Sequence, residues 1–238
     1  MARRLFYLNE VKREQGWIRG ETADHLRRVL RAAEGQQFEL SDGIRFYLGE
    51  LAAFGRGEVE FRIVETREAG PRPLRTHLLA SLIKFDHFEW ILEKATELGV
   101  NRITPVNALR SEKGLEQAAH KRMERWLRIV RESGQQCRRL RPPEIGEPVA
   151  LKLALAVDAG HRLWLEEEAG ARPILQCAPE AGDVALLAGP EGGWDDRERA
   201  QAAESGWTPV SLGPNIMRAE TACMAALAVL NARAAVCD

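Results

Sequence analysis

Two glycine-bearing segments near the C-terminal end of the sequence hold the residues best suited to chemistry. The first is LLAGPEGG at residues 186–193, and the second is SLGPNIMRAET at residues 211–221. Each continues an apolar run that predicts a strand, and ligands of open α/β sheets bind beyond the carboxyl ends of the strands. The first segment lacks the Lys-Ser/Thr pair of a P-loop and does not match GxGxxG. We therefore expect a ligand site at these turns that is not a phosphate-binding loop.

Glu191, in the middle of the first turn, indicates the charge of the expected ligand. A carboxylate at this position repels phosphate and attracts a cation. S-adenosylmethionine carries a sulfonium and an ammonium group, together with an adenine that can form hydrogen bonds, so it fits this turn better than a phosphate does. One glycine turn alone most often only joins a strand to a helix. The second turn, followed at once by Arg218, Glu220 and Thr221, favours a binding site.

The chain after residue 74 alternates strand-like and helix-like patterns. We expect strands at residues 76–83, 100–106, 151–160, 184–190 and 207–214, and helices at 85–99, 115–137 and 216–236. Thr221 is a candidate cap for the last of these helices, and the alternative is a hydrogen bond to the neighbouring loop. Such alternation predicts an α/β domain with a mostly parallel sheet that helices cover on both faces.

Residues 1–70 have a different pattern of short segments. Alternating apolar and polar residues predict antiparallel strands at 4–8, 16–20, 38–43, 45–54 and 57–65, and residues 22–30 predict one helix that Thr22 caps. A small β-barrel with one embedded helix fits this order. The segment EAGPRPL at residues 68–74 interrupts any regular element. The predicted domains are therefore residues 1–70 and 74–238.

The formal net charge of −1 gives no support for a nucleic-acid partner, but the basic residues are clustered. One cluster is HLRRVLR at residues 25–31, and the other covers residues 121–141. The clusters fit an anionic partner as well as they fit solvated helix faces.

Other classes of site are not expected. The four cysteines, Cys137, Cys177, Cys223 and Cys237, form no CxxC pair, and the histidines lack metal-ligand spacing. We therefore expect free thiols and no metal. No apolar run reaches eighteen residues, and the N-terminus lacks the hydrophobic segment of a signal peptide. These features predict a cytoplasmic protein with no membrane partner.

Four separated motifs, in order along the chain, resemble one known family. The motifs are EKATELGVNRITPVNALRSE, RWLRIVRESGQQCRRLRPPEI, LLAGPEGGWDDRE and SLGPNIMRAETA, and DHLRRVLRAAEGQQFELSDG resembles the N-terminal module of the same family. The family is the small-subunit ribosomal RNA uridine-N3 methyltransferases, a branch of the SPOUT superfamily. The likeness covers nearly the whole chain.

The resemblance implies a fold and an activity. It implies an N-terminal PUA-like barrel that helps to bind RNA and a C-terminal α/β domain with a deep trefoil knot, which is a rare topology. It also implies a homodimer with its active site near the subunit interface. The implied reaction is methylation of N3 of one uridine in the decoding region of 16S rRNA, with S-adenosylmethionine bound against the knotted loops.

The cofactor-binding residues are carried over from the family position by position. They are Leu187, Gly189, Pro190, Glu191, Gly192 and Gly193 in the first loop, and Leu212, Gly213, Pro214, Ile216, Met217 and Arg218 in the second. The chain departs from the family pattern in four places. Asn215 replaces the usual arginine, Met217 replaces leucine, Glu93 replaces glutamine, and Gln135 replaces glutamate. The change at Met217 conserves volume, whereas the change at Asn215 removes a cation.

Methylation of uridine N3 requires removal of a weakly acidic proton, and Arg218 and Glu220 are the candidate catalytic residues. Arg218 would stabilise the uracil anion or orient a phosphate, and Glu220 would serve as general base. Glu220 could equally form an ion pair with an arginine or interact with the helix dipole. The best candidates for phosphate contacts are Arg27, Arg28, Arg31, Arg138, Arg139 and Arg141.

Two alternative functions remain open from the sequence. A non-catalytic RNA-binding or ribosome assembly factor would use the N-terminal module alone and would not bind S-adenosylmethionine. A ribose 2′-O RNA methyltransferase would bind it, but would modify the sugar and not the base.

Overall fold

A computed structural model describes residues 5–70, 72–168 and 170–235 of the chain. The chain separates into two compact units. One contains the described residues up to residue 70 together with Gly134–Pro142, and the other contains Arg72–Ser133 together with the described residues from Pro143 onward.

The N-terminal unit is built on a six-stranded sheet in the order β1-β4-β5-β6-β3-β2. Its strands are β1 Leu5–Tyr7, β2 Glu10–Lys12, β3 Gln15–Arg19, β4 Gln37–Ser41, β5 Arg45–Phe54 and β6 Glu58–Glu68. Neighbouring strands are antiparallel except for β1 and β4, which run parallel. One apolar cluster, which includes Phe38, Leu40 and Phe61, fills this unit.

The helix expected at residues 22–30 is present in a different form. A four-residue helix, α1 Glu21–Asp24, continues into a π-helical turn, η1 His25–Val29. The prediction that Thr22 caps this helix is wrong, because Thr22 lies inside α1 and Gly20 is the N-cap residue. Gly20 has a φ of 69°, a backbone conformation that favours glycine over a capping side chain.

Residues 134–142 close the N-terminal unit from far along the chain. The Tyr7 hydroxyl donates to the Arg139 carbonyl oxygen at 3.1 Å, and the Ser41 hydroxyl donates to the Leu140 carbonyl oxygen at 2.5 Å. A Cβ atom on Gly134 would lie 2.5 Å from the Tyr7 hydroxyl, so a larger residue there would displace this hydroxyl. The N-terminal unit therefore contains residues that a division of the chain near residue 70 leaves out.

The C-terminal unit is built on a parallel sheet of eight strands in the order β10-β8-β7-β13-β11-β14-β12, with β9 paired to β8. The strands are β7 Leu74–Ser81, β8 Arg102–Asn107, β9 Glu144–Ile145, β10 Val149–Ala150, β11 His161–Leu165, β12 Arg172–Pro173, β13 Gly182–Ala188 and β14 Thr208–Ser211. The helices are α2 Phe85–Glu97, α3 Leu115–His120, α4 Met123–Gln136, α5 Leu151–Leu155, α6 Ile174–Cys177, α7 Asp196–Glu204 and α8 Ala219–Ala235. The expected α/β class is confirmed.

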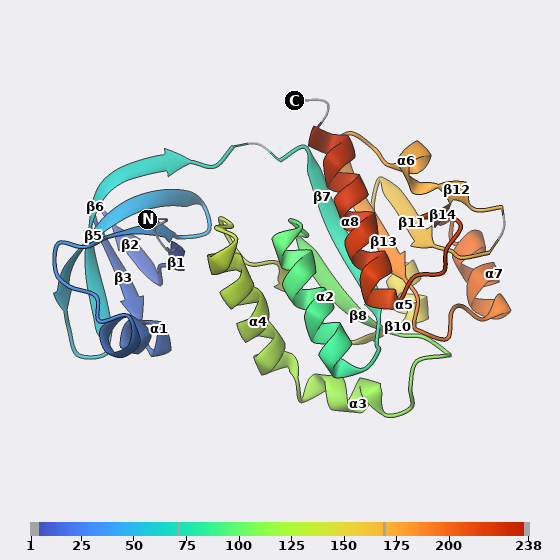
Figure 1. The fold of residues 1–238 in the computed structure, drawn as a ribbon, viewed down its shortest axis with the longest axis horizontal. Coiled ribbons are helices and arrows are strands. Elements are labelled where there is room, and N and C mark those ends of the chain that lie inside the picture. The colour runs from blue at the N-terminus through green and yellow to red at the C-terminus, as the bar shows by residue number, and fades with distance from the viewer. Residues whose placement is uncertain (1–4, 71, 169, 236–238) are drawn as a thin grey trace. The chain divides into compact units, whose positions relative to one another are not determined.

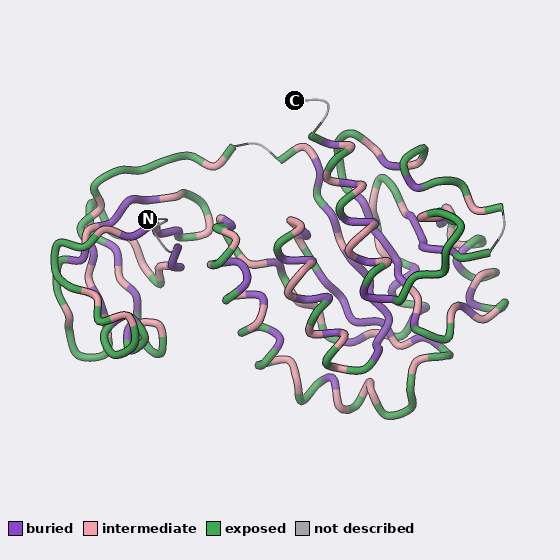
Figure 2. Tube along the Cα trace, viewed as in Figure 1, coloured by how far each residue is buried: buried purple, intermediate pink, exposed green. Residues whose placement is uncertain are grey.

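Side chains on alternate strand positions enter two separate cores. On β7, Leu78 belongs to the cluster that includes α2, α4 and α8, whereas Leu79 belongs to the cluster with α5 and α7. Leu186 and Leu187 on β13 divide between the clusters in the same way. Figure 1 shows α2 and α8 side by side over the sheet, and Figure 2 shows that the central strands are mostly buried. Burial on both faces explains why these strands are almost continuously apolar.

Two expectations for this unit are wrong. Residues 151–160 were expected to form a strand, but they begin with helix α5, in which the buried residues Leu151, Ala154 and Leu155 recur at helical spacing. The strand of this region is β11, which sequence analysis missed. The long helix expected at 115–137 divides into α3 and α4, because the amides of Lys121 and Arg122 bond to carbonyl groups three residues earlier and so tighten the chain into a turn.

The other expected elements, β7, α2, β8, β13, β14 and α8, lie close to their expected positions, whereas β9, β10, β12, α6 and α7 were not expected. The last helix ends at Ala235 within the described residues, and Val236 lies outside them. Thr221 is the third residue of α8 and so does not cap it, contrary to the prediction. The trefoil knot that the resemblance implies remains a prediction.

Candidate functional site

A cavity of about 290 Å³ opens beyond the carboxyl ends of β11, β13 and β14. The loops that follow these three strands form its walls, together with the start of α8. This is the place where ligands of open α/β sheets bind, and it is where the sequence predicted a site.

Most of the predicted cofactor residues line this cavity. They are Gly189, Pro190, Glu191, Gly193, Leu212, Gly213, Ile216, Met217 and Arg218. Three others lie beside it. Leu187 is a residue of β13 buried in the core with α5 and α7, Pro214 is exposed in the second loop, and the Gly192 carbonyl oxygen accepts a hydrogen bond from Arg110 at 3.0 Å. Asn215 also lines the cavity.

A third wall of the cavity was not predicted from the sequence. Leu165, Glu166 and Glu167, at the end of β11, line the cavity beside the two glycine loops. Their signal in the sequence is the segment HRLWLEEE at residues 161–168, an apolar run that ends in acidic residues. Assigning the strand to residues 151–160 hid this segment, because the true carboxyl end of the strand lies further along the chain.

Acidic side chains dominate the charge of the cavity. Glu191 is exposed in the first loop, and Glu167 is exposed on the opposite wall. A Cβ atom built on Gly193, whose φ is +67°, would lie 2.8 Å from the Glu167 Oε1 atom. The two loops are therefore close enough for the Glu167 carboxylate to face the first glycine turn. Such a cavity favours a ligand with positive charge.

Glu166 holds the third wall in place. Its Oε2 atom accepts a hydrogen bond from the Arg199 Nε atom at 2.8 Å, and its Oε1 atom accepts from the backbone amide of Glu167 at 2.8 Å. Burial acts to raise the pKa of Glu166, but the bonds from Arg199 and from the amides of Glu168 and Glu167 lower it below its ordinary value. Glu166 therefore remains ionised and serves to anchor the loop.

Contacts of Trp194 and of the start of helix α7 hold the first glycine loop in place. The Trp194 indole Nε1 atom donates to the Leu165 carbonyl oxygen at 2.9 Å, which joins the loop to the end of β11. Asp195 and Glu198 form a capping box at the start of α7. Glu198 also accepts from the Leu109 amide at 2.7 Å. These contacts fix the loop before any ligand binds.

Arg218 and Glu220 are close in sequence but face different surroundings. Arg218 is exposed and lines the cavity. Glu220 is only 4% exposed, and its Oε1 atom lies 2.9 Å from the His87 Nδ1 atom. Among the described residues, no ion pair joins Arg218 to Glu220, so the arginine–glutamate pair considered from the sequence is replaced by a histidine–glutamate contact.

The six predicted phosphate-binding arginines all belong to the N-terminal unit, because Gly134–Pro142 groups with it. Arg27, Arg28, Arg31, Arg138 and Arg141 are exposed. Arg139 is only 6% exposed. Its guanidinium therefore presents little surface to an external ligand.

Other kinds of site are absent from the part of the chain that the structure describes. No group of three or more metal-ligating side chains occurs there. Cys137, Cys177 and Cys223 form no disulfide with one another, and Cys237 lies outside the described residues. None of the described helices is both long and apolar enough to span a membrane.

Comparisons with known proteins agree with this geometry. The family model described as an RNA methyltransferase domain matches residues 70–231, and the model of an RNA methyltransferase PUA domain matches residues 18–64. The Bacillus subtilis protein named ribosomal RNA small subunit methyltransferase E is 30% identical over 90% of this chain and 88% of its own. The Synechocystis protein of the same name is 33% identical over 87% of this chain and 70% of its own.

A solved structure has the same fold. The Neisseria gonorrhoeae ribosomal RNA small subunit methyltransferase E bound to S-adenosyl methionine superposes with a TM-score of 0.87. It is 27% identical in sequence, and the match covers 97% of this chain and 98% of that one.

Proposed function

The chain belongs to the ribosomal RNA small subunit methyltransferase E family, and from this we propose that it methylates N3 of a uridine in 16S rRNA with S-adenosylmethionine as donor. The observation that carries the proposal is the acidic cavity at the carboxyl ends of three parallel strands, with Arg218 at its edge. Family membership alone would leave the site unspecified, and the cavity alone would leave the substrate unspecified.

The cavity fits the methyl donor by its charge and by its backbone. Glu191 and Glu167 supply carboxylates for the ammonium and sulfonium groups, and the glycines bring the backbone of both loops to the cavity wall, where an adenosine would contact it. Gly213 has a φ of +128° and no atom within 4 Å of a built Cβ, so its backbone borders open space. When bound, S-adenosylmethionine supplies a methyl carbon that an electron pair on nitrogen can attack.

Arg218 and Glu220 are the proposed residues for the chemistry at uracil. The N3 atom becomes a nucleophile as it loses its proton, and negative charge then spreads over the uracil ring. Arg218, exposed at the cavity, is placed to stabilise that charge. Glu220, in the first turn of α8, is the carboxylate proposed to take part in proton removal.

The RNA contacts are proposed for the N-terminal unit. We assign residues 1–70 to a PUA-like RNA-binding domain and residues 74–238 to the methyltransferase domain. The exposed residues Arg27, Arg28, Arg31, Arg138 and Arg141 would neutralise phosphates, and Arg139 would support the segment that carries two of them. RNA affinity should then fall steeply with salt.

The homodimer and the cytoplasmic location are part of the same proposal. A cytoplasmic location is proposed because the proposed substrate is an RNA of the small ribosomal subunit. Sedimentation equilibrium of the purified chain tests the dimer, and a monomer at micromolar concentration would contradict it.

The reaction is tested on small-subunit RNA from a strain that lacks the protein. Purified protein and S-adenosylmethionine are added, and the digested nucleosides are identified by mass spectrometry. The proposal predicts 3-methyluridine. A 2′-O-methylated nucleoside would support a ribose methyltransferase instead, and absence of donor binding in a calorimeter would support a non-catalytic RNA-binding factor.

Replacement of Arg218 tests the site. Arg218→Ala should abolish methyl transfer and leave the melting temperature unchanged, because the side chain is exposed and stabilises charge only during the reaction. Near-normal turnover in this variant would exclude Arg218 from the chemistry.

A further inference from the structure

We propose that His87 is the group that accepts the N3 proton of the target uridine, and that Glu220 is a positioning residue that acts through it. This inference rests on the proposed function and deepens it. It concerns a histidine to which sequence analysis assigned no role.

The surroundings of Glu220 show why it needs an intermediary. Its side chain is only 5% exposed, so its carboxylate cannot contact the base of an RNA that arrives from solvent. The His87 side chain is 33% exposed, and its Nδ1 atom lies 2.9 Å from the Glu220 Oε1 atom. A proton that travels from the substrate to this pair therefore reaches the imidazole first.

The contact also fixes which ring nitrogen is available. In the proposed arrangement the Nδ1 atom of His87 donates and the Glu220 carboxylate accepts. In the neutral ring the lone pair is then on Nε2. The Nε2 atom lies 3.8 Å from the Asp86 Oδ2 atom, which is beyond hydrogen-bond distance. A carboxylate that orients an imidazole in this way is a recurring arrangement in general-base catalysis.

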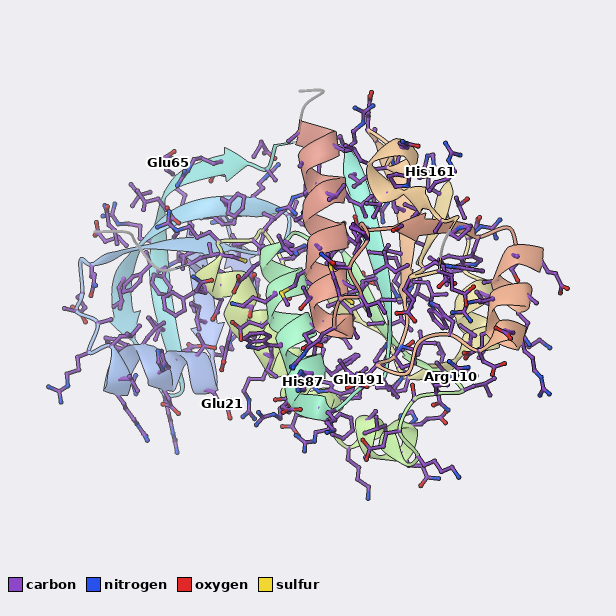
Figure 3. The ribbon with its side chains drawn as sticks, turned by 45° about the vertical axis from the view of Figure 1, so that its right-hand side comes forward. Glu21, Glu65, His87, Arg110, His161 and Glu191 are labelled. Carbon is purple, nitrogen blue, oxygen red and sulfur yellow. The ribbon has the colours of Figure 1, made fainter. Side chains whose placement is uncertain are left out.

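The topology places His87 at the cavity end of the sheet. His87 lies in the first turn of α2, which follows the carboxyl end of β7. Strands β7 and β13 are neighbours in the parallel sheet, with Ala80 paired to Ala188, the residue just before the first glycine loop. Figure 3 labels His87 and Glu191 at the same end of the sheet. On the other side of Glu220, Ala219 and Ala222 of α8 line the cavity itself.

Cys223 does not compete for the proton. Burial, together with the charge of Glu220, raises the pKa of the Cys223 thiol to about 12. The thiol is 1% exposed and stays protonated. Of these two groups beside Glu220, the His87 imidazole is therefore the accessible acceptor.

The reaction balances with these groups. The N3 proton moves to the Nε2 atom of His87, and the N3 electron pair forms the bond to the methyl carbon of the donor. The carbon–sulfur bond breaks toward sulfur, which leaves a neutral thioether and an N3-methylated uridine. The imidazolium, held by the Glu220 carboxylate, then releases its proton to water.

His87→Gln is the decisive variant, because glutamine can donate a hydrogen bond to Glu220 but cannot accept the proton. Its single-turnover methylation rate on small-subunit RNA should fall by about 100-fold, within the usual contribution of a general base. Its affinity for S-adenosylmethionine, measured by calorimetry, should stay at the wild-type value, because His87 is not among the residues that line the cavity. Added imidazole should restore activity to His87→Ala in proportion to its concentration. A near-normal rate in His87→Gln would overturn the proposal.

A matched control and a second measurement complete the test. His120→Gln removes an imidazole that contacts a carboxylate in the same way, Nδ1 to Glu147 Oε2 at 3.0 Å, at an exposed surface. It should methylate at the normal rate. Nitrogen NMR of the protein without donor should find the His87 ring protonated at Nδ1, and Glu220→Gln should change that signal. An Nε2-protonated ring would overturn the proposal whatever the activity of the variants.

The outcomes separate the two levels of inference. A wild-type protein that binds the donor but methylates no uridine would overturn the proposed function and His87 with it. An active wild-type protein with an equally active His87→Gln variant would overturn only the role of His87.

Discussion

Gly189 is the position where one added methyl group should reveal how the first loop binds the methyl donor. A Cβ atom built on Gly189 would lie 3.0 Å from Trp194 Cε2 and 3.1 Å from Trp194 Nε1. Gly189 is not among the described residues with positive φ, so alanine can adopt its backbone conformation without strain. The effect of Gly189→Ala should therefore come from packing alone.

The size of the effect follows from how firmly Trp194 is held. The indole is 5% exposed and belongs to the core beneath α7, and its Nε1 atom is bonded to the Leu165 carbonyl oxygen. It cannot move aside without losing that bond or compressing the core. Overpacking of this kind costs about 1–3 kcal/mol. If the loop yields instead of the ring, the affinity for S-adenosylmethionine should fall by roughly 5- to 150-fold.

Calorimetry with the donor and unfolding in urea together measure the effect. Gly57→Ala is the control, because Gly57 has a φ of +77° and open space around its Cβ position, in the N-terminal unit. It should cost about 1 kcal/mol of stability and leave donor affinity unchanged. Combining Gly189→Ala with Trp194→Phe should recover part of the loss, because phenylalanine lacks the ring atoms that the methyl group approaches. Wild-type affinity and stability in Gly189→Ala would refute the reasoning.

Three further predictions concern single side chains. Arg199→Ala leaves the Glu166 carboxylate buried without its cation, so the free energy of unfolding in urea should fall by about 3 kcal/mol, and a loss below about 1 kcal/mol would contradict the anchoring role. Burial, and the charge of Arg102, lower the pKa of His77 to about 4, against an ordinary value near 6.5. Between pH 7 and pH 5, His77 becomes protonated in the unfolded chain but stays neutral in the folded chain. The free energy of unfolding should therefore fall by about 2 kcal/mol over this range. The His77→Gln variant should lack this loss. If the free energy of unfolding of the two proteins depended on pH in the same way, a contribution from His77 would be excluded. Asn215→Arg adds a cation to an exposed loop, so RNA affinity should rise. The slope of the logarithm of the binding constant against the logarithm of salt concentration should become more negative by about 1. An unchanged slope would exclude a phosphate contact at this position.

The sequence by itself determined the α/β class and the position of the cavity. Both depend on local patterns, because continuous apolar runs mark strands buried on two faces and glycines mark the sharp turns that follow them. The segments ending at Ala188 and Ser211 carried this information without reference to the rest of the chain.

Tertiary structure decided what the local pattern left ambiguous. An apolar run such as Leu151–Leu155 fits a helix or a strand equally well until its neighbours determine which side chains are buried. The true strand β11, with Glu167 beyond its end, was missed for that reason. In the same way, nothing in the sequence near Arg139 indicates that it is buried by strands more than ninety residues earlier.

The contact between His87 and Glu220 is the strongest case, because 133 positions separate them in the chain. The sequence alone shows that one residue is a histidine and the other a glutamate, and the expected reaction requires a general base. Their pairing exists only because two helices begin at the same edge of one sheet. Sequence specifies which groups can do chemistry through local propensity, whereas long-range packing selects which of them meet.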